Sequence, residues 1–263
     1  MKRFLYPILV FMLVAVLVVG CGPKEPANHY EAIKEAGKVV IGTSADYPPF
    51  EYIDDDGNIA GFDIDLAYAL GEEMGLEVEI VDMPFDSLIA AVQEGKIDMS
   101  IAAFNYDEGR DEKIDYTIAY FSSVDAFLVA EDFTGEFTAP EDLANYTIAV
   151  QTSTTQDGWL TENLVEAGLM SEDDLFRYDR ADQAALDVKS GRVDVLMLDS
   201  IPAKAFVEEF GGLKIAYTAE VATGPINAII PDGDAELQEA LNKAIQTLLD
   251  EGFVDELALK YFG

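Results

Sequence analysis

One arginine of this chain lies among acidic residues and is a candidate for binding a carboxylate from outside the chain. The stretch NYDEGRDEKIDY, residues 105–116, places Arg110 among five acids. A guanidinium group binds a carboxylate through two parallel charge-assisted hydrogen bonds, which lysine cannot form. Arginine is also scarce, because residues 4–263 contain only Arg110, Arg177, Arg180 and Arg192. We therefore favour a carboxylate ligand for Arg110, and the alternative is a surface salt bridge with its neighbours.

Asp199 is a candidate for binding the opposite charge. It ends the apolar run VDVLMLD, residues 193–199, which has the composition of a buried strand. Ligands of open α/β sheets bind beyond the carboxyl ends of the strands, so an acid at this place faces a cleft rather than the core. Asp199 also precedes the predicted helix SIPAKAF and could cap its first N–H groups. The two roles are compatible, and we expect its carboxylate to contact a ligand.

Two other acidic clusters have structural explanations. In YIDDDGNIAGF, the EF-hand pattern of calcium sites requires an aspartate five positions before Gly57, where Tyr52 stands. A tight turn between two strands fits this stretch better. Asp63 and Asp65 in GFDIDL open a predicted helix, where acids cap free N–H groups. We expect neither a metal site nor a cofactor.

The single histidine and the single cysteine both precede the predicted folded part. His29 ends the polar, proline-bearing stretch GPKEPANH, where we expect it to have no partner. Metal sites and nucleophilic triads that need a histidine are therefore disfavoured. With Cys21 as the only cysteine, no disulfide within the chain can form.

The first twenty residues resemble a lipoprotein signal peptide. Two cationic residues precede an apolar run from Phe4 to Val19, and small residues follow directly before Cys21. A run of this length spans about 24 Å as a helix, less than the ~30 Å hydrocarbon layer of a bilayer, so a permanent membrane anchor is the weaker interpretation. We expect residues 1–20 to be a signal peptide, Cys21 to carry lipid, and residues 21–37 to form a lipid-anchored tether.

Composition excludes some partners. The 263 residues include 16 Lys+Arg and 51 Asp+Glu, which gives a formal net charge of −35, and 50% of them are hydrophobic. This apolar content suits one or two globular domains. The negative field of the protein repels nucleic-acid phosphates, so nucleic acid is not an expected partner.

The order of the predicted elements indicates an α/β fold with two lobes. Short β-branched runs alternate with helical patterns in two series, and an amphipathic helix over residues 235–250 and a short helix to Tyr261 follow them. Strands separated by helices of about ten residues predict mostly parallel sheets with helices on both faces. No linker separates the series, so we expect the lobes to share a ligand cleft. The predicted strands are KVVIGT, LEVEIVDM, KIDMSIAAF, YTIAV, LFRYD, VDVLMLD and KIAYT, and the helices between them cover 64–74 and 85–93 and begin near 154, 181 and 200.

Three motifs together resemble a known family. YPPFE, GFDIDL and the terminal KYFG, at these separations, are similar to the solute-binding proteins of polar amino-acid ABC transporters, bacterial solute-binding protein family 3. The resemblance runs from about Val39 to the end of the chain and implies the type II periplasmic-binding-protein fold, with the ligand in the cleft between the lobes. It implies a discontinuous lobe 1 over 38–122 and 226–263 and a lobe 2 over 123–225. The chain would cross between them near 121–124 and 221–227.

The resemblance also implies roles for residues that match the family's motifs. Arg110 matches the arginine that binds the ligand's α-carboxylate, and Asp199 matches the acid that receives its α-ammonium group. Thr154 and Thr155 match threonines at the start of a helix in lobe 2, where free N–H groups suit a carboxylate. The remaining predicted ligand-binding residues, of which the first two supply rings beside the ligand's side chain, are Tyr47, Phe85, Asn105, Ala103, Gln151 and Ser44. For Phe85, ordinary core packing is an equally good explanation.

Three residues depart from the family's pattern and bear on the ligand. Ser153 stands where the family usually has glycine, Asn105 where it has serine, and Asp107 where it has threonine. Asp107 either steadies Arg110 from behind or faces a cationic ligand side chain. Basic-selective relatives often carry an acid where Ser44 stands, which favours a polar or neutral amino acid here, whereas Asp107 favours a basic one.

The function that the resemblance implies is capture of a free amino acid by an extracytoplasmic, lipid-anchored monomer that delivers it unchanged to an ABC transporter permease. Two alternatives stay open. One is an enzyme on the same fold, similar to cyclohexadienyl or arogenate dehydratases, in which Asp107 or Glu51 would act as the acid. The other is a sensory module that presents its ligand to a receptor.

Overall fold

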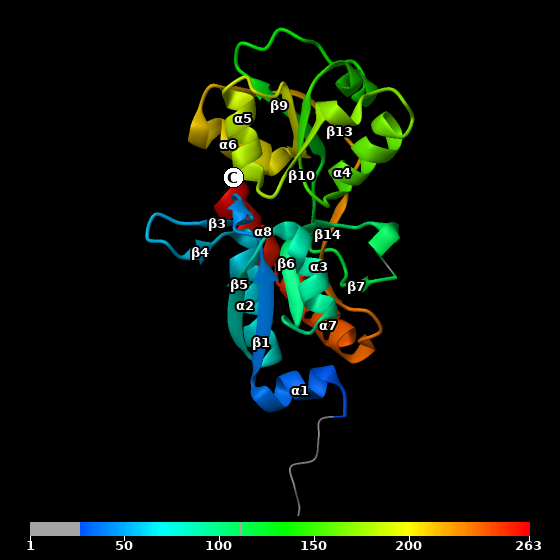
Figure 1. Cartoon of the computed structure of the whole chain (residues 1–263). Helices are drawn as coiled ribbons and strands as arrows, with labels where there is room; N and C mark the ends of the chain where they lie inside the picture. Colours follow the sequence, from blue (N-terminus) through cyan, green and yellow to red (C-terminus); the bar gives the residue numbers. More distant parts are fainter. Residues whose placement is uncertain (1–26, 111) are drawn as a thin grey trace, which may run out of the picture.

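The computed structural model describes residues 27–110 and 112–263, which form two lobes joined by two crossings of the chain (Figure 1). The predicted signal peptide and Cys21 lie outside the described residues. The chain passes from the first sheet to the second between Ser122 and Asp125, and it returns between Ala219 and Pro225. Each lobe has one main sheet with helices on both faces, so the predicted α/β class with two lobes is confirmed.

The sheet of lobe 1 has the order β5-β1-β6-β14-β7, and β8 also pairs with β14. β1 runs parallel to β5 and β6, whereas β14 runs antiparallel to β6, β7 and β8. The strands are β1 (Lys38–Thr43), β5 (Glu77–Asp82), β6 (Met99–Asn105), β7 (Ile114–Tyr116), β8 (Phe121–Ser122) and β14 (Pro225–Pro231).

The sheet of lobe 2 repeats this plan with the order β11-β10-β12-β9-β13. β10 is parallel to β11 and β12, and β9 is antiparallel to β12 and β13. The strands are β9 (Asp125–Ala130), β10 (Ile148–Gln151), β11 (Leu175–Tyr178), β12 (Val195–Asp199) and β13 (Leu213–Ala219).

Both sheets are mixed, where the sequence pattern predicts mostly parallel ones. The reason is the double crossing. β9 and β14 each follow a crossing, so each begins at the edge that faces the other lobe and runs away from it. The strands β6, β10 and β12 run the other way and end at that edge, which makes the pairs β12·β9 and β6·β14 antiparallel.

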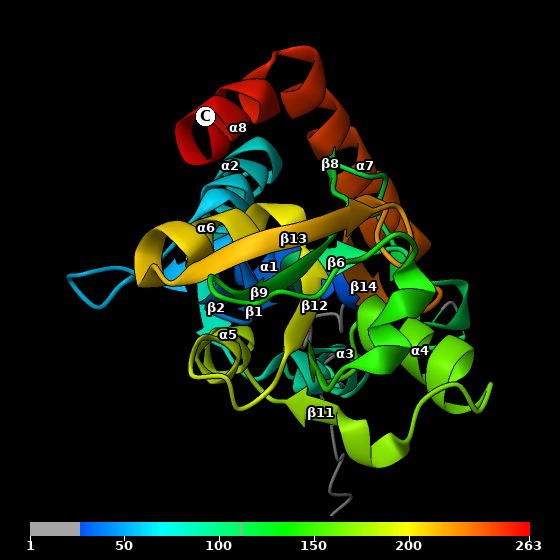
Figure 2. The ribbon, with the colours of Figure 1, turned by 90° about the horizontal axis from the view of Figure 1, so that it is seen from above.

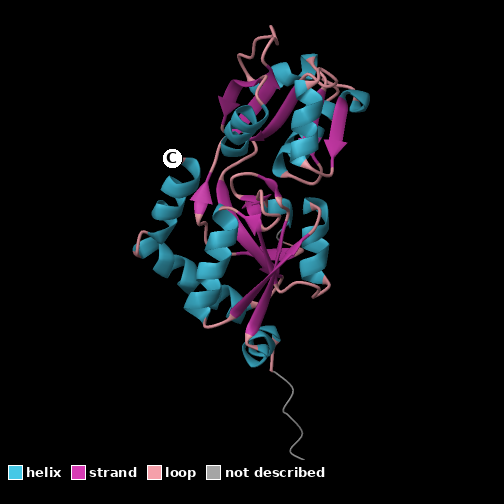
Figure 3. Cartoon of the chain, turned by 90° about the vertical axis from the view of Figure 1, so that its left-hand side faces the viewer, coloured by secondary structure: helices cyan, strands magenta, loops and turns pink. Residues whose placement is uncertain are grey.

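The helices cover both faces of each sheet because alternate strand residues point to opposite sides. Figure 3 shows helices on both sides of the lobe 1 sheet. Ile101 of β6 packs in the core that α2 and α7 share, whereas Phe104 packs with α3. In lobe 2, α5 and α6 lie on one side of β12 and α4 on the other (Figure 2). Leu196 of β12 packs with α5 and α6, whereas Met197 packs with α4. The helices are α1 (His29–Ala36), α2 (Phe62–Met74), α3 (Phe85–Gln93), α4 (Thr155–Leu160), α5 (Ala181–Lys189), α6 (Ser200–Phe210), α7 (Ala235–Asp250) and α8 (Phe253–Phe262), with short turns η1 (Glu108–Arg110), η2 (Pro140–Asn145), η3 (Thr161–Val165) and η4 (Glu172–Asp174).

A small sheet of β2 (Asp46–Tyr47), β3 (Glu51–Ile53) and β4 (Ile59–Ala60) carries the YPPFE motif. The Asp54 carboxylate accepts hydrogen bonds from the backbone N–H groups of Asp56 and Asn58, at 2.9 and 2.8 Å, as expected for a tight turn. After β4, Gly61 has φ of 135°, and a Cβ there would lie 2.2 Å from the carbonyl oxygen of Phe50. The glycine of GFDIDL is therefore required for the hairpin to lie against the start of α2.

The N-terminal segment differs from the prediction. Residues 29–36, which we expect within the tether, form α1, and Ile33 of this helix is buried against lobe 1. His29, which we expect to have no partner, lies 2.8 Å through Nδ1 from Asp234 and 2.9 Å through Nε2 from Asp98. Both acids are far from His29 in sequence, so only the folded chain brings the three side chains together.

Candidate functional site

One cavity between the lobes is lined by all ten residues that we predict to bind a ligand. Ser44, Tyr47, Phe85, Ala103, Asn105 and Arg110 belong to lobe 1, and Gln151, Thr154, Thr155 and Asp199 belong to lobe 2. The space outside protein atoms at this cavity is about 340 Å³, a figure that includes space open to solvent. Four further lining residues are not among the predicted ligand-binding residues, namely Asp46, Glu51, Ala102 and Gln156, although the enzyme alternative names Glu51 as an acid.

Arg110 is held in place while part of its guanidinium group stays free. It ends η1, directly after β6, and is 8% exposed. Its Nη2 donates to the carbonyl oxygen of Ser153 at 2.8 Å, across the interface between the lobes. Its Nη1 is buried and has no hydrogen-bond partner within residues 27–110 and 112–263. An unpaired buried guanidinium nitrogen costs free energy, so this atom is a strong candidate for binding an acceptor that the chain does not supply.

Asp107 lies behind Arg110. Its Oδ2 is 3.4 Å from Nε of Arg110, and its Oδ1 accepts the backbone N–H of Gly109 at 2.8 Å. It does not line the cavity, so of its two possible roles the structure supports the steadying of Arg110. The same position argues against Asp107 as an acid for catalysis in the cavity.

Asp199 is a buried carboxylate surrounded by neutral donors. The Tyr47 hydroxyl donates to its Oδ2 at 2.7 Å, and the side-chain amides of Asn105 and Gln156 lie 3.3 and 3.2 Å away. Its side chain makes no capping bond to α6, so the alternative role is not used. Burial raises the pKa of Asp199 to about 6, although the hydrogen bond from Tyr47 lowers it. A cation beside this group would favour its charged form.

Asp46 connects the two lobes at the other end of the cavity. Its Oδ1 accepts the Ser44 hydroxyl at 2.8 Å, and its Oδ2 accepts the Gln151 amide at 3.1 Å and the Ala181 backbone N–H at 2.6 Å. Burial raises the pKa of Asp46. Together with the Tyr47–Asp199 contact, these bonds hold the lobes in a closed arrangement.

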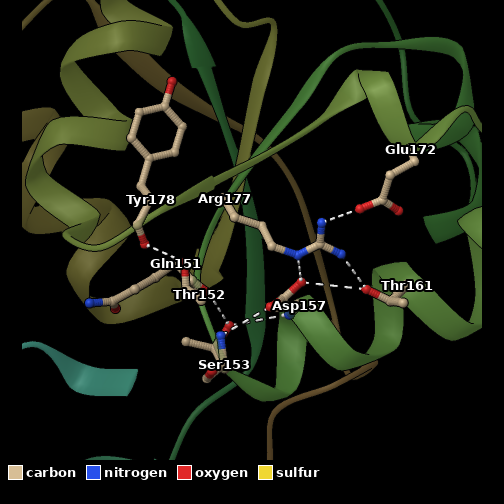
Figure 4. A network of polar contacts seen from close by, with 9 residues as sticks. Gln151, Thr152, Ser153, Asp157, Thr161, Glu172, Arg177 and Tyr178 are labelled. Carbon is tan, nitrogen blue, oxygen red and sulfur yellow. Dashed lines mark hydrogen bonds and ion pairs between the residues drawn. The ribbon is translucent and has the colours of Figure 1, made fainter. Parts of the chain in front are cut away.

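The start of α4 is fixed by a network of ion pairs on lobe 2 (Figure 4). The Thr154 hydroxyl accepts the Asp157 backbone N–H and caps the helix. Asp157 accepts the Ser153 N–H at 3.0 Å and pairs with Nε of Arg177 at 2.7 Å, and Arg177 also contacts Thr161 and Glu172. Ser153 has φ of 64°, a left-handed conformation that glycine adopts most easily. This explains the family's glycine, and the serine is accommodated with its carbonyl turned to Arg110.

Two buried acids, Glu51 and Asp63, lie at the cavity. Asp63 does not have the helix-capping role that the sequence predicts. Asp63 is fully buried and does not cap α2, because its carboxylate accepts the Ala103 N–H at 2.7 Å and the Tyr120 hydroxyl at 2.9 Å. Its side chain also contacts that of Glu51, which lines the cavity. Burial raises the pKa of Glu51 well above its usual value and that of Asp63 to about 7. Asp65 instead pairs with Lys260 at the surface.

Sequence signals for these missed residues exist. Glu51 and Asp63 belong to YPPFE and GFDIDL, the motifs that carry the resemblance. Asp46 lies two residues after Ser44 and one before Tyr47, both predicted site residues.

Among the described residues, no group of three or more His, Cys, Asp or Glu side chains is placed to hold a metal ion. In that same part of the chain, no helix is both long and apolar enough to cross a membrane.

Comparison with known proteins gives a consistent result. The family model of bacterial extracellular solute-binding proteins, family 3, matches residues 39–263. The arginine-binding extracellular protein ArtP of Bacillus subtilis is 30% identical over 267 residues, which cover 100% of this chain and 98% of ArtP. A solved ancestral arginine-binding protein bound to arginine is 33% identical with a TM-score of 0.80, over 86% of this chain and 99% of that one. A solved ancestral arginine-binding protein bound to glutamine is also 33% identical with a TM-score of 0.79, over 86% and 98%.

Proposed function

The chain belongs to the bacterial extracellular solute-binding proteins of family 3, and from this premise we propose that it captures a free α-amino acid between its lobes and delivers it to an ABC importer. The observation that carries the proposal is a pair of buried, opposite charges in one cavity. Within the described residues, Nη1 of Arg110 from lobe 1 has no hydrogen-bond partner, and Asp199 from lobe 2 has no cationic partner. Such a pair is complementary to an α-carboxylate and an α-ammonium group.

Closure follows from the same placement. A zwitterion that contacts Arg110 on one lobe and Asp199 on the other makes its full set of hydrogen bonds only when the lobes are together, so the ligand favours the closed form. Thr154 and Thr155 add polar contacts from α4. The rings of Tyr47 and Phe85 border the space left for the side chain, and Phe85 is itself held by Phe104 at 4.7 Å between ring centroids.

The cavity favours a ligand whose side chain donates hydrogen bonds. Ser44 by itself favours a polar or neutral amino acid, but the structure adds Asp46 and Glu51, two buried acids, to the lining. Some relatives are named for arginine, and one was solved with glutamine. Both of these amino acids carry hydrogen-bond donors at the end of the side chain. We infer that polar and cationic amino acids are preferred over purely apolar ones.

We further propose that Cys21 carries the lipid anchor. α1 begins at His29, eight positions after Cys21, and a fully extended link of that length reaches about 27 Å. The lobes would therefore stay close to the membrane that holds the permease. The cysteine itself lies outside the described residues, so this proposal rests on the signal-peptide pattern of residues 1–21.

A thermal-unfolding panel with the twenty amino acids tests ligand capture. A ligand present at about 100 times its Kd stabilises the folded protein by about 2.7 kcal/mol. We expect a shift with at least one amino acid, and we expect Arg110→Met to abolish it while the unliganded protein stays folded. Arg192→Met is the matched control, because that side chain is 70% exposed and its one ion pair within the described residues is with Asp187.

Two results would contradict the proposal. The first is a panel without any shift, and the second is a shift that survives Arg110→Met. Mass spectrometry of the ligand after incubation separates binding from catalysis. Recovery of the unchanged amino acid is expected, whereas turnover would favour an enzyme on this fold.

A further inference from the structure

Ser153, on the lobe 2 side of the interface, is held in a backbone conformation that serine disfavours. Among the described residues other than glycine, only Ser153 and Ala103 have φ in the left-handed region. This conformation brings the Cβ atom of an L-residue close to the following carbonyl oxygen, whereas glycine adopts it freely. A strained residue persists where its surroundings fix it, so the contacts of Ser153 identify what holds the turn.

The contact that fixes Ser153 comes from Asp157, in the first turn of α4. The Asp157 carboxylate accepts the Ser153 N–H through Oδ2 at 3.0 Å. Its Oδ1 lies 2.7 Å from Nε of Arg177 and 3.4 Å from the Thr161 hydroxyl. The Asp157 side chain is only 13% exposed, so these partners rather than water fix its position. Both oxygens of the carboxylate are therefore used within lobe 2.

Arg177 fixes Asp157 in turn. Its guanidinium group lies between Asp157, Thr161 and Glu172 (Figure 4). Nε donates to Asp157 and Nη2 donates to Thr161 at 2.8 Å, so these two bonds set the orientation of the Asp157 carboxylate. Arg177 belongs to β11, which pairs with β10, the strand that leads into the Ser153 turn. Arg177, Asp157 and Ser153 all lie outside the lining of the ligand cavity.

The turn affects the ligand site because its carbonyl group receives Arg110 from the other lobe. The Ser153 oxygen accepts Nη2 of Arg110 at 2.8 Å. With Nη2 bound in this way, the buried Nη1 is left without a partner within residues 27–110 and 112–263. If Ser153 left its left-handed conformation, its carbonyl group would turn away and the guanidinium group would lose this support.

We propose that Asp157 and Arg177 are positioning residues for ligand binding, which hold Ser153 in its left-handed conformation so that its carbonyl group directs Arg110 toward the ligand's carboxylate. This inference rests on the proposed function and deepens it. Without the pair, Ser153 adopts this conformation only part of the time, and the apparent affinity falls by that fraction. Because the pair acts through Arg110 and does not line the cavity, the loss is the same for different amino acids.

A double-mutant cycle between positions 153 and 177 tests the proposal. Isothermal titration calorimetry of the full mature chain gives the affinities for L-arginine and L-glutamine in the unaltered protein, Arg177→Met, Ser153→Gly and the double variant. We expect Arg177→Met to weaken binding of each probe about tenfold, the scale set by the cost of the left-handed conformation for serine. In the Ser153→Gly background the same change should weaken binding less than about threefold, because glycine adopts this conformation without support.

Asp157→Asn provides a second route to the same answer. An amide has one acceptor oxygen where the carboxylate uses two, so it cannot serve Ser153 and Arg177 together. Its loss of affinity should likewise depend on whether residue 153 is serine or glycine. If Arg177→Met fails to fold, this cycle decides the question alone. Arg192→Met, which removes a lobe 2 arginine that pairs with Asp187, is the matched control and should leave the affinity unchanged.

The outcomes separate the positioning role from the proposed function. An affinity that is unchanged in Arg177→Met, or that falls equally with serine and with glycine at position 153, would overturn the positioning role and leave amino-acid capture intact. A loss confined to one of two bound probes would overturn it as well, because the pair would then act on the ligand's side chain. Failure of the unaltered protein to bind any of the twenty amino acids would instead overturn the proposed function.

Discussion

Asp199 shows at the scale of one residue how burial and hydrogen bonding set a charge. Burial disfavours its charged form, and donors from Tyr47, Asn105 and Gln156 partly compensate. The result is a carboxyl group that titrates at a pKa of about 6 in the closed protein without ligand. Asp107 is more exposed than Asp199, and it supports Arg110 without lining the cavity.

We predict that the affinity for a neutral amino acid falls as the pH falls below about 6. The ligand's α-ammonium group stabilises the ionised form of Asp199, so the pKa of Asp199 is lower in the complex than the value of about 6 without ligand. Binding therefore takes up no proton above pH 6 and requires proton loss below it, which weakens binding by up to tenfold per pH unit. Titrations from about pH 5 to pH 8 measure this, and Asp199→Asn should bind weakly with little pH dependence. An affinity that is constant across this range would exclude the role of Asp199.

At the scale of secondary-structure elements, α1 illustrates docking by a few specific contacts. The helix begins after Asn28, whose side chain accepts the Glu31 N–H, and it buries Ile33. His29 connects it to Asp98, before β6, and to Asp234, which caps α7. These groups come from three separate parts of lobe 1, so His29 links α1 to the rest of that lobe.

We predict that His29→Gln destabilises the protein more at pH 6 than at pH 8. The hydrogen bond to Asp98, opposed by burial and supported by Asp234, raises the pKa of His29 above 6.5. The stability gained from the protonated ring is fully present below the unfolded value of 6.5 and is lost as the pH rises through the folded value. Because the side chain is 33% exposed, we expect a loss of only about 1 kcal/mol at pH 6. Urea unfolding at both pH values measures it, and Lys34→Gln on the same helix should show no such pH dependence.

At the scale of the whole molecule, the two crossings of the chain connect the lobes and are themselves tied together. Asp125, at the start of β9, accepts the backbone N–H groups of Val221, Ala222 and Thr223, so it ties the outgoing crossing to the returning one. The lobes also meet through Asp46, Asp199 and Arg110, all of which line the ligand cavity. The charge of −35 keeps the protein soluble and does not determine the fold.

We predict that Cys21→Ala releases the protein from the membrane without changing ligand binding. The variant lacks the thiol that would carry lipid, while the cavity lies in residues that begin after position 43. Cell fractionation should find the variant in the soluble extracytoplasmic fraction and the unaltered protein with the membrane. A variant that stays with the membrane would show that residues 1–20 or another surface hold it there.

The sequence by itself determined the α/β class, the two series of elements and the family. Periodic patterns predicted α3 and α7 with their observed bounds, because local spacing of apolar residues fixes which face of a helix is buried. The Asp54 turn is likewise local, because its carboxylate accepts N–H groups two and four residues further along the chain. The residues that match the family also led to one cavity, because Ser44, Asn105, Gln151 and Asp199 lie at or directly after the ends of strands, and Phe85 and Thr155 begin helices.

Only the tertiary structure decided which charged groups have partners. Asp63 opens a helix in sequence but faces Ala103 and Glu51 in space, and His29 precedes the fold in sequence but contacts two distant acids. Burial and the pKa of a carboxyl group depend on neighbours from other elements, which local patterns do not contain. For the same reason, local patterns do not predict the mixed pairing of both sheets, nor that Nη1 of Arg110 is buried without a partner in the described part of the chain.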